Sequence, residues 1–389
     1  MFDQGPNQLY HHQQWTWSWP NDVPLINLYY YSSCRFYYQS LEFLRASTNF
    51  IVKYRLAPSH LLWYFDFVRN YNVPVSPSIP FSQNYLTILK LFPILADILI
   101  AFILYKLTKS YLLPAIFLFS PFSWYISALW GQTDPLAFLF ILLSFIFYKT
   151  PSLSSLLFFI SFSLKPTSFF LIPLFLYIYF RQKPKLISII ISISLCLLIT
   201  YITISVFNIS PDKLIQRILN RIDALTINSY NFWHIFVLDH PPKTSFFTKT
   251  LSFIFYLLLN LQSFKILNKK LDLKSIFSAL FIISFGSWLF LTNMLDRYAF
   301  IGIVSGLFLC FYYPKILKYW IPLSLIFWLN LFRSWWFPSF LWPLKDILTY
   351  RQAFAGLPLS LLNLFFFLKI VHHISIKNPP IKGDSETTK

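Results

Sequence analysis

The stretch that decides the fold is residues 275–313, which read SIFSALFIISFGSWLFLTNMLDRYAFIGIVSGLFLCFYY. Two apolar runs, 275–293 and 298–313, are separated by a polar motif that begins at Leu295. Comparable runs recur along the chain, at 85–105, 111–128, 134–148, 152–164, 167–180, 186–207, 247–265, 318–333 and 356–371. A helix crosses a bilayer with about 20 mostly apolar residues, so the pattern predicts an all-α, polytopic transmembrane bundle of about eleven spans. The count falls to about ten if the short runs 152–164 and 167–180 are tilted, re-entrant or broken.

Composition also indicates a membrane protein. Hydrophobic residues make up 56% of the chain and charged residues only 12%, whereas a soluble domain averages about a quarter charged residues. The formal net charge is +18. We do not interpret it as nucleic-acid binding, because the basic residues fall in short clusters between apolar runs, where they set topology and contact anionic lipids. The cysteines Cys34, Cys196 and Cys310 are far apart, so they predict neither a disulfide framework nor a metal site.

The connecting loops indicate an orientation. If residues 1–84 lie outside the cell, the basic residues of the alternate loops gather inside: Lys106, Lys109, Lys149, Arg181, Lys183, Lys185, Lys265, Lys269, Lys270, Lys274, Lys315 and Lys318. Short inner loops rich in lysine and arginine are the positive-inside pattern. The pattern predicts a multi-pass protein of the plasma membrane, with its bundle at 85–372 and a disordered cytoplasmic tail at 373–389.

The outer side would hold the longest segments between the apolar runs, namely 1–84, 208–246 and 334–355. Residues 33–68 alternate aromatic, apolar and basic residues, which is typical of helices that lie at the membrane interface. Residue 1 would already be outside, and no signal-peptide pattern is visible at the start of the sequence. We therefore expect one further helix before residue 1.

Candidate site residues gather in the outer loops and near the outer helix ends. Asp3 and Asp22 lie in an aromatic-rich stretch, where an acid is either a general base for an amphiphilic substrate or a solvated loop carboxylate. Asp97 falls inside the first apolar run, and a carboxylate there is expected to be paired or to line a polar cavity. Gln132 and Asp134 belong to Gly131-Gln132-Thr133-Asp134, which is either a site or a helix-capping turn.

The remaining candidates are cationic, amide and aromatic residues. Lys165 either extends toward water or pairs with an anion such as phosphate. Asn231 and Trp233 suit a sugar, because an amide bonds hydroxyls and an indole face packs on the ring. Arg297, between Asp296 and Tyr298, either grips a phosphate in a bidentate manner or anchors the helix at the interface.

Together these residues resemble the GT-C superfamily of polyprenyl-phosphate-sugar-dependent glycosyltransferases, in particular the bacterial and archaeal relatives of the dolichol-pathway glucosyl- and mannosyltransferases. The matches follow the family's order: Asp3, Val23-Pro24-Leu25, Lys90-Leu91 to Asp97-Ile98, Gly131-Gln132-Thr133-Asp134, Ser163-Leu164-Lys165-Pro166, Asn231-Phe232-Trp233 and Leu295-Asp296-Arg297-Tyr298. Two positions depart from it. Val23 stands where the family has a first proline, and Leu295-Asp296 stands where it has His-Glu.

The resemblance implies transfer of a hexose, with inversion, from a polyprenyl-phosphate donor to an extracytoplasmic glycan, lipid-linked glycan or protein. Asp3 or Asp22 would be the base, and Arg297 and Lys165 the cations that face the phosphate. No cofactor or metal is expected. The rivals are a transporter or flippase of lipid-linked sugars, although no internal repeat is visible, and a non-catalytic subunit of the same superfamily.

Overall fold

The computed structural model describes residues 83–207, 224–237, 243–335, 344, 348 and 352–377. Within these ranges the chain is helical, and one isolated parallel β-bridge joins Ile227 to Leu295. The predicted all-α class is therefore confirmed for the part of the chain that the structure describes. Asp3, Asp22, the interfacial segment 33–68 and most of the tail 373–389 lie outside the described residues.

Every predicted apolar run contains a helix. The α-helices of the described residues are α5 (Gln83–Thr108), α6 (Leu112–Phe119), α7 (Pro121–Trp124), α8 (Asp134–Ile146), α9 (Pro151–Leu164), α10 (Ile172–Arg181), α11 (Leu186–Phe207), α13 (Phe246–Lys269), α14 (Leu273–Phe290), α15 (Phe300–Tyr312), α16 (Leu317–Trp335) and α18 (Gln352–Lys377). Short π- and 3₁₀-helical turns join several of them: η2 (Tyr125–Leu129), η3 (Pro166–Leu171), η4 (Phe232–Phe236), η5 (Asp296–Ala299) and η6 (Pro314–Ile316).

The predicted number of spans is not confirmed. Among the described residues, four helices are long and apolar enough to cross a membrane: Lys90–Thr108, Phe246–Lys269, Leu273–Phe290 and Ala355–Ile376. A fifth candidate is the pair Leu112–Phe119 and Pro121–Leu129, which is bent by 47°. The 13-residue helices α8 and α15 extend only about 20 Å at 1.5 Å per residue. That length falls short of a hydrocarbon core about 30 Å thick.

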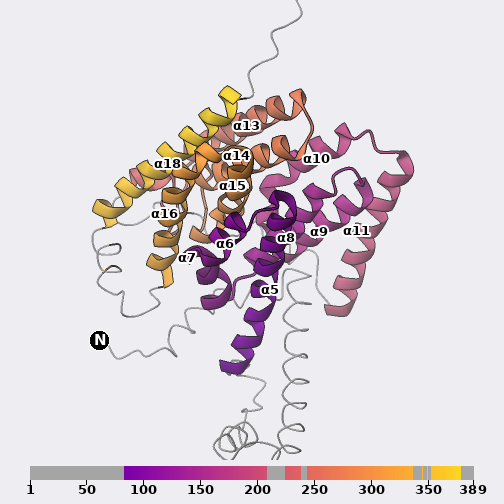
Figure 1. Ribbon diagram of the computed structural model, residues 1–389, viewed down its shortest axis with the longest axis horizontal. Helices are drawn as coiled ribbons and strands as arrows, with labels where there is room; N and C mark the ends of the chain where they lie inside the picture. Colours follow the sequence, from indigo (N-terminus) through magenta and orange to yellow (C-terminus); the bar gives the residue numbers. More distant parts are fainter. Residues whose placement is uncertain are drawn as a thin grey trace, which may run out of the picture.

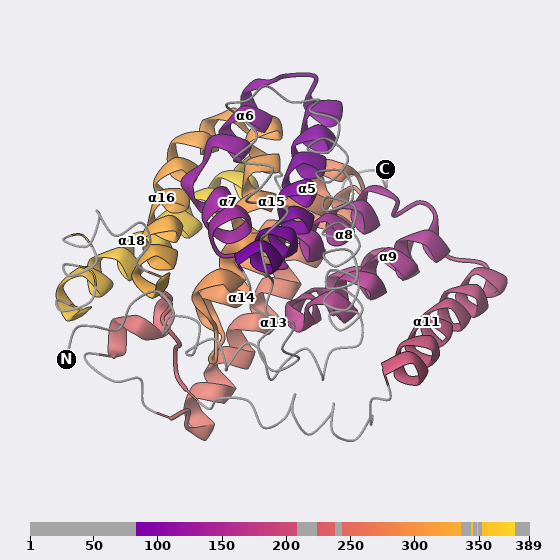
Figure 2. The same ribbon diagram turned by 90° about the horizontal axis from the view of Figure 1, so that it is seen from below.

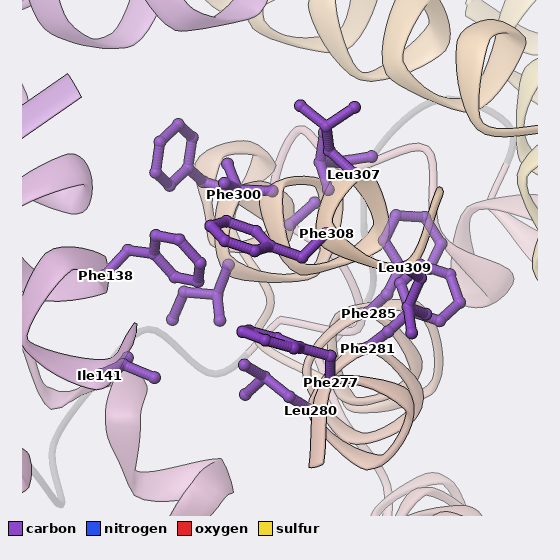
Figure 3. Close-up of a cluster of buried hydrophobic side chains, with 14 of the residues drawn as sticks. Phe138, Ile141, Phe277, Leu280, Phe281, Phe285, Phe300, Leu307, Phe308 and Leu309 are labelled. Carbon is purple, nitrogen blue, oxygen red and sulfur yellow. The ribbon is translucent and has the colours of Figure 1, made fainter. Parts of the chain in front are cut away.

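The centre of the bundle is α14 with α15. Every residue of α14 from Ser275 to Phe290 is buried, and its phenylalanines meet those of α8 and α15 (Figure 3). Phe277 stacks on Phe308 at 4.8 Å between ring centroids. The two helices approach closely because residue 302 is glycine: a Cβ there would lie 2.6 Å from the Cβ of Phe285. Small residues allow this backbone approach in membrane bundles.

The outer helices present apolar side chains away from this core. Leu95, Leu197 and Leu258 each expose about half or more of their surface, on α5, α11 and α13. In both views α11 lies at the edge of the bundle, and it packs against α9 (Figures 1 and 2). Such faces suit lipid chains, and the structure supports a helical membrane protein with four or five candidate spans.

Candidate functional site

Two motif segments that are distant in sequence lie side by side. The backbone N–H of Ile227 donates to the carbonyl of Met294 at 3.2 Å, and the Asn293 N–H donates to the Ala224 carbonyl at 3.1 Å. The hydroxyl of Ser229 donates to the same Met294 carbonyl at 2.7 Å. These bonds hold the loop 224–237 against the turn that precedes Asp296. The predicted Asn231 and Arg297 motifs therefore belong to one region.

Trp233 has a structural role in this loop. Its indole Nε1 donates to the carbonyl of Phe290 at 2.7 Å, and the residue is buried. Its ring packs edge-on against Phe232. The buried indole anchors the loop to the end of α14. It therefore does not present the open face to a sugar that the sequence analysis predicted.

Lys165 and Asp134 form a buried ion pair. Lys165 follows the last residue of α9, and Asp134 is in the first turn of α8, so two helix ends bring the charges together. Their side chains expose only 10% and 3% of their surface. Thr133 occupies the N-cap position of α8, as the capping alternative expected, and Pro135 lies in the first turn, but Thr133 makes no side-chain cap hydrogen bond. The negative charge of Asp134 still favours the helix N-terminus.

Arg297 lies between aromatic rings beside this pair. The centre of its guanidinium is 5.1 Å from the Trp130 ring and 5.9 Å from the Tyr298 ring. Lys165 lies 5.8 Å from the same Tyr298 ring, so the two cations flank one tyrosine. The Nε of Arg297 is buried and finds no hydrogen-bond partner among the described residues. A guanidinium held close to aromatic rings, with a donor still unused, is well suited to a phosphate.

Asp296 completes the charged cluster. The residue is 2% exposed, and its carboxylate accepts from the Arg297 backbone N–H at 2.8 Å. Burial raises the pKa of Asp296, the positive charge of Arg297 and a hydrogen bond from Ser334 oppose the rise, and the negative charge of Asp134 adds to it. Since Asp296 and Asp134 influence each other electrostatically, the acids and cations of the two motifs form one charged site.

The turn that leads into Asp134 packs on Lys90. Gly131 has φ +72°, and a Cβ there would lie 3.0 Å from the Cγ of Lys90. Glycine is favoured here both by the positive φ and by the lack of space. Gln132, the next residue, is half-buried, and its N–H donates to the carbonyl of Ile126. Lys90 thus supports the turn that positions Gln132 and Asp134.

Asp97 is paired, as expected of a carboxylate inside an apolar helix. The hydroxyl of Ser123 donates to its Oδ2 at 3.3 Å, and Ser127 forms a second hydrogen bond. Both serines lie on the segment α7–η2 that precedes Gly131. The other carboxylate oxygen of Asp97, Oδ1, is buried and has no hydrogen-bond partner among the described residues. Asp97 therefore holds the lead-in to the 131–134 turn, and it forms no ion pair with the charged cluster in the described part of the chain.

Several polar residues of α16 and α18 were missed by the sequence analysis. Asn330 Oδ1 accepts from the N–H of Tyr230 at 2.8 Å, and Asn363 Nδ2 donates to the carbonyl of Tyr230 at 2.8 Å. Arg333 lies 5.2 Å from the Tyr230 ring. The available signal was a lone amide in each apolar run, Leu329-Asn330-Leu331 and Leu362-Asn363-Leu364, because such residues usually bond across helices.

His234 closes the contact between the loop and α18. Burial, with the nearby charge of Arg333, lowers the pKa of His234 to about 4, so the imidazole is neutral near pH 7. A Cβ on Gly356 would lie 2.2 Å from its Nε2, which explains why glycine stands there. No group of three or more His, Cys, Asp or Glu residues that could hold a metal ion occurs in the described part of the chain.

These residues define a class of protein. No protein-family model matches the chain, and no curated protein is similar enough to be counted as a relative. The class therefore follows from the structure itself. The described part is an all-helical protein whose apolar helices suggest a membrane protein. Its buried ionic residues meet where α8 begins, α9 and α14 end, and α15 begins.

Proposed function

We propose that the chain is a membrane glycosyltransferase that moves a hexose, with inversion, from a polyprenyl-phosphate donor to an extracytoplasmic acceptor. The observation that supports the proposal most is the convergence described above. The motifs at Gln132–Asp134, Lys165, Asn231 and Asp296–Tyr298 were chosen separately along the sequence, and they meet in one charged and amide-rich region. If these motifs were independent capping turns and interfacial anchors, nothing would require them to lie close together.

The chemistry of the region fits such a donor. Its prenyl tail needs a lipid-exposed protein, and its phosphate needs fixed cations. Arg297 has an unused buried donor and lies near the Trp130 ring, while Lys165 lies near the same Tyr298 ring as Arg297. Fixed cations stabilise the negative charge that develops on the leaving phosphate.

The general base in this proposal is Asp3, with Asp22 as its alternative. Asp134 is less suited to the task, because its carboxylate is paired with the buried Lys165. Protonation of Asp134 would leave that lysine without its counter-charge, which is unfavourable in a buried site. The bias of lysine and arginine in the loops orients the charged cluster toward the extracytoplasmic side of the plasma membrane.

The phosphate role of Arg297 is tested by donor binding. Replacing it in Arg297→Ala is expected to weaken binding of a short-chain polyprenyl phosphate by about 10- to 100-fold, because a hydrogen bond to a charged group contributes about 1.5–3 kcal/mol. Arg297→Lys should recover only part of the loss, since lysine lacks the planar fork. The measurement is equilibrium binding of the radiolabelled lipid to protein in nanodiscs.

Lys106→Ala is the matched control for this experiment. Lys106 is exposed, lies in the last turn of α5 and rests on Phe102 at 5.1 Å. Its removal changes the net charge equally but should leave the affinity unchanged. Undiminished binding by Arg297→Ala would make Arg297 an interfacial anchor and remove the phosphate site from the proposal.

A further inference from the structure

An amide cluster lies beside the backbone of Tyr230, and we define it as Asn231, Asn330, Ser360 and Asn363. The cluster draws on the loop 224–237, on α16 and on α18, and these helices pack against each other (Figure 1). Its four members are at most 1% exposed. Asn330 and Asn363 each touch the Tyr230 peptide, Asn231 is the next residue, and Ser360 lies one turn before Asn363 on the same helix.

Each member of the cluster is only partly satisfied. Asn330 uses Oδ1 on the Tyr230 N–H, Asn363 uses Nδ2 on the Tyr230 carbonyl, and Asn231 uses Oδ1 on the His234 N–H. The opposite end of each amide and the hydroxyl of Ser360 have no hydrogen-bond partner among the residues described. The amides cannot be turned over to cure this, because the backbone atoms fix which end of each side chain faces them.

Such a group of unused atoms needs an explanation. Buried polar atoms are nearly always hydrogen-bonded in folded proteins, and a buried polar atom without a hydrogen bond destabilises the folded state. Holding the backbone of Tyr230 in place requires only the amide atoms that already bond it, namely Asn330 Oδ1 and Asn363 Nδ2. The unused ends therefore point to a polar guest, which is either ordered water or a ligand.

The chemistry of the unused atoms selects the ligand class. Asn231 and Asn330 offer N–H donors, Asn363 offers a carbonyl acceptor, and Ser360 can donate or accept. A phosphate is disfavoured, because an ionised phosphate has no proton to donate to the carbonyl of Asn363. A cation is disfavoured, because the N–H groups of Asn231 and Asn330 carry partial positive charge and need an acceptor. A neutral group with neighbouring hydroxyls matches all of them, since each hydroxyl both donates and accepts.

We propose that the amide cluster binds the hydroxyls of the donor's hexose, an inference that rests on the proposed function. The cluster and the charged site are joined through the end of α16. The hydroxyl of Ser334 lies 3.4 Å from the backbone carbonyl of Asn330 and also within hydrogen-bonding reach of Asp296, next to Arg297, so its one proton is shared between the two acceptors. The amide cluster and the phosphate site are therefore neighbours along the end of α16.

The test compares two probes, a short-chain polyprenyl phosphate and the same lipid with one mannose attached, bound to the full chain in nanodiscs. The wild type is expected to bind the mannosyl lipid at least about 10-fold more tightly, because buried groups made to bond hydroxyls reject a ligand that lacks them. Ser360→Ala is expected to remove most of this preference while leaving polyprenyl phosphate affinity unchanged, because it removes only a hydroxyl that has no hydrogen-bond partner among the described residues. Asn330→Asp keeps the acceptor for Tyr230 and should also remove most of the preference.

The control is Ser305→Ala, which removes a buried hydroxyl that bonds the Gly302 carbonyl on α15. It should keep the mannose preference. Ser360→Ala should also keep the ligand-free melting temperature, so it decides the matter if Asn330→Asp fails to fold. A wild type without mannose preference, or variants that retain it, would overturn the hexose site and leave water as the guest. Failure of the wild type to bind either probe would instead overturn the proposed function, and the hexose site with it.

Discussion

Lys165→Met is expected to destabilise the folded protein by about 3–5 kcal/mol, because removing one partner of a buried ion pair leaves the other charge uncompensated. Methionine keeps most of the apolar stem of lysine, so lost packing contributes little. Asp134 is 3% exposed, and water therefore cannot replace the lost cation. The measurement is reversible denaturant unfolding in mixed micelles, read as the free energy of unfolding at a fixed pH near 7.

The double variant Lys165→Met with Asp134→Leu should recover most of that stability, since a buried ion pair replaced by apolar side chains is often neutral. Lys149→Met is the control. Lys149 is exposed and rests 6.0 Å from the Tyr148 ring, and surface changes usually stay within about 0.5 kcal/mol. If Lys165→Met were as stable as Lys149→Met, the pair would not be the buried contact on which the site is built.

Asp3→Asn is expected to reduce the rate of hexose transfer by about two orders of magnitude or more, the usual contribution of a general base. Asparagine keeps the size and much of the hydrogen bonding of aspartate but cannot accept the acceptor's proton. Donor binding should survive, because the carboxylate is not needed to hold the phosphate. The transfer rate and the donor affinity are measured on the same preparation.

Asp22→Asn is the matched control, since Asp22 is the other acid in the aromatic-rich stretch before residue 33. Loss of transfer in Asp3→Asn alone supports Asp3 as the base. Loss in Asp22→Asn alone moves the base to the Pro-Asn-Asp-Val-Pro stretch. Full activity in both variants would exclude both acids and with them the N-terminal base of the proposed mechanism.

The helices themselves could be predicted because an apolar run is a local signal. The runs 275–293 and 247–265 correspond to α14 and α13. The span count could not be predicted, since it depends on where prolines divide the runs. The run 111–128 breaks at Ser120-Pro121, and the resulting helices are bent by 47°. Proline lacks the N–H and clashes with the preceding turn, so a single apolar run became a bent pair.

The candidate site could be predicted only residue by residue. Lys165 and Asp134 were each identified, but their pairing depends on how α8 packs against α9, which no local pattern shows. Trp233 was interpreted as a sugar platform because tryptophan beside asparagine is typical of such sites, whereas its Nε1 bonds the Phe290 carbonyl. Asn330 and Asn363 were missed, because the lone amide in each apolar run indicates that a partner exists but not that both amides bond the backbone of Tyr230.

The central claim is tested most directly by following a radiolabelled hexose in proteoliposomes. The purified chain is reconstituted with a polyprenyl-phosphate-linked hexose and an extract of envelope lipids and glycans. We expect that the label leaves the donor for a second molecule, that free polyprenyl phosphate appears in equal amount, and that Arg297→Ala abolishes both. A label that stays on the donor would contradict the proposed transferase activity, and an intact donor that merely changes leaflet would identify a flippase.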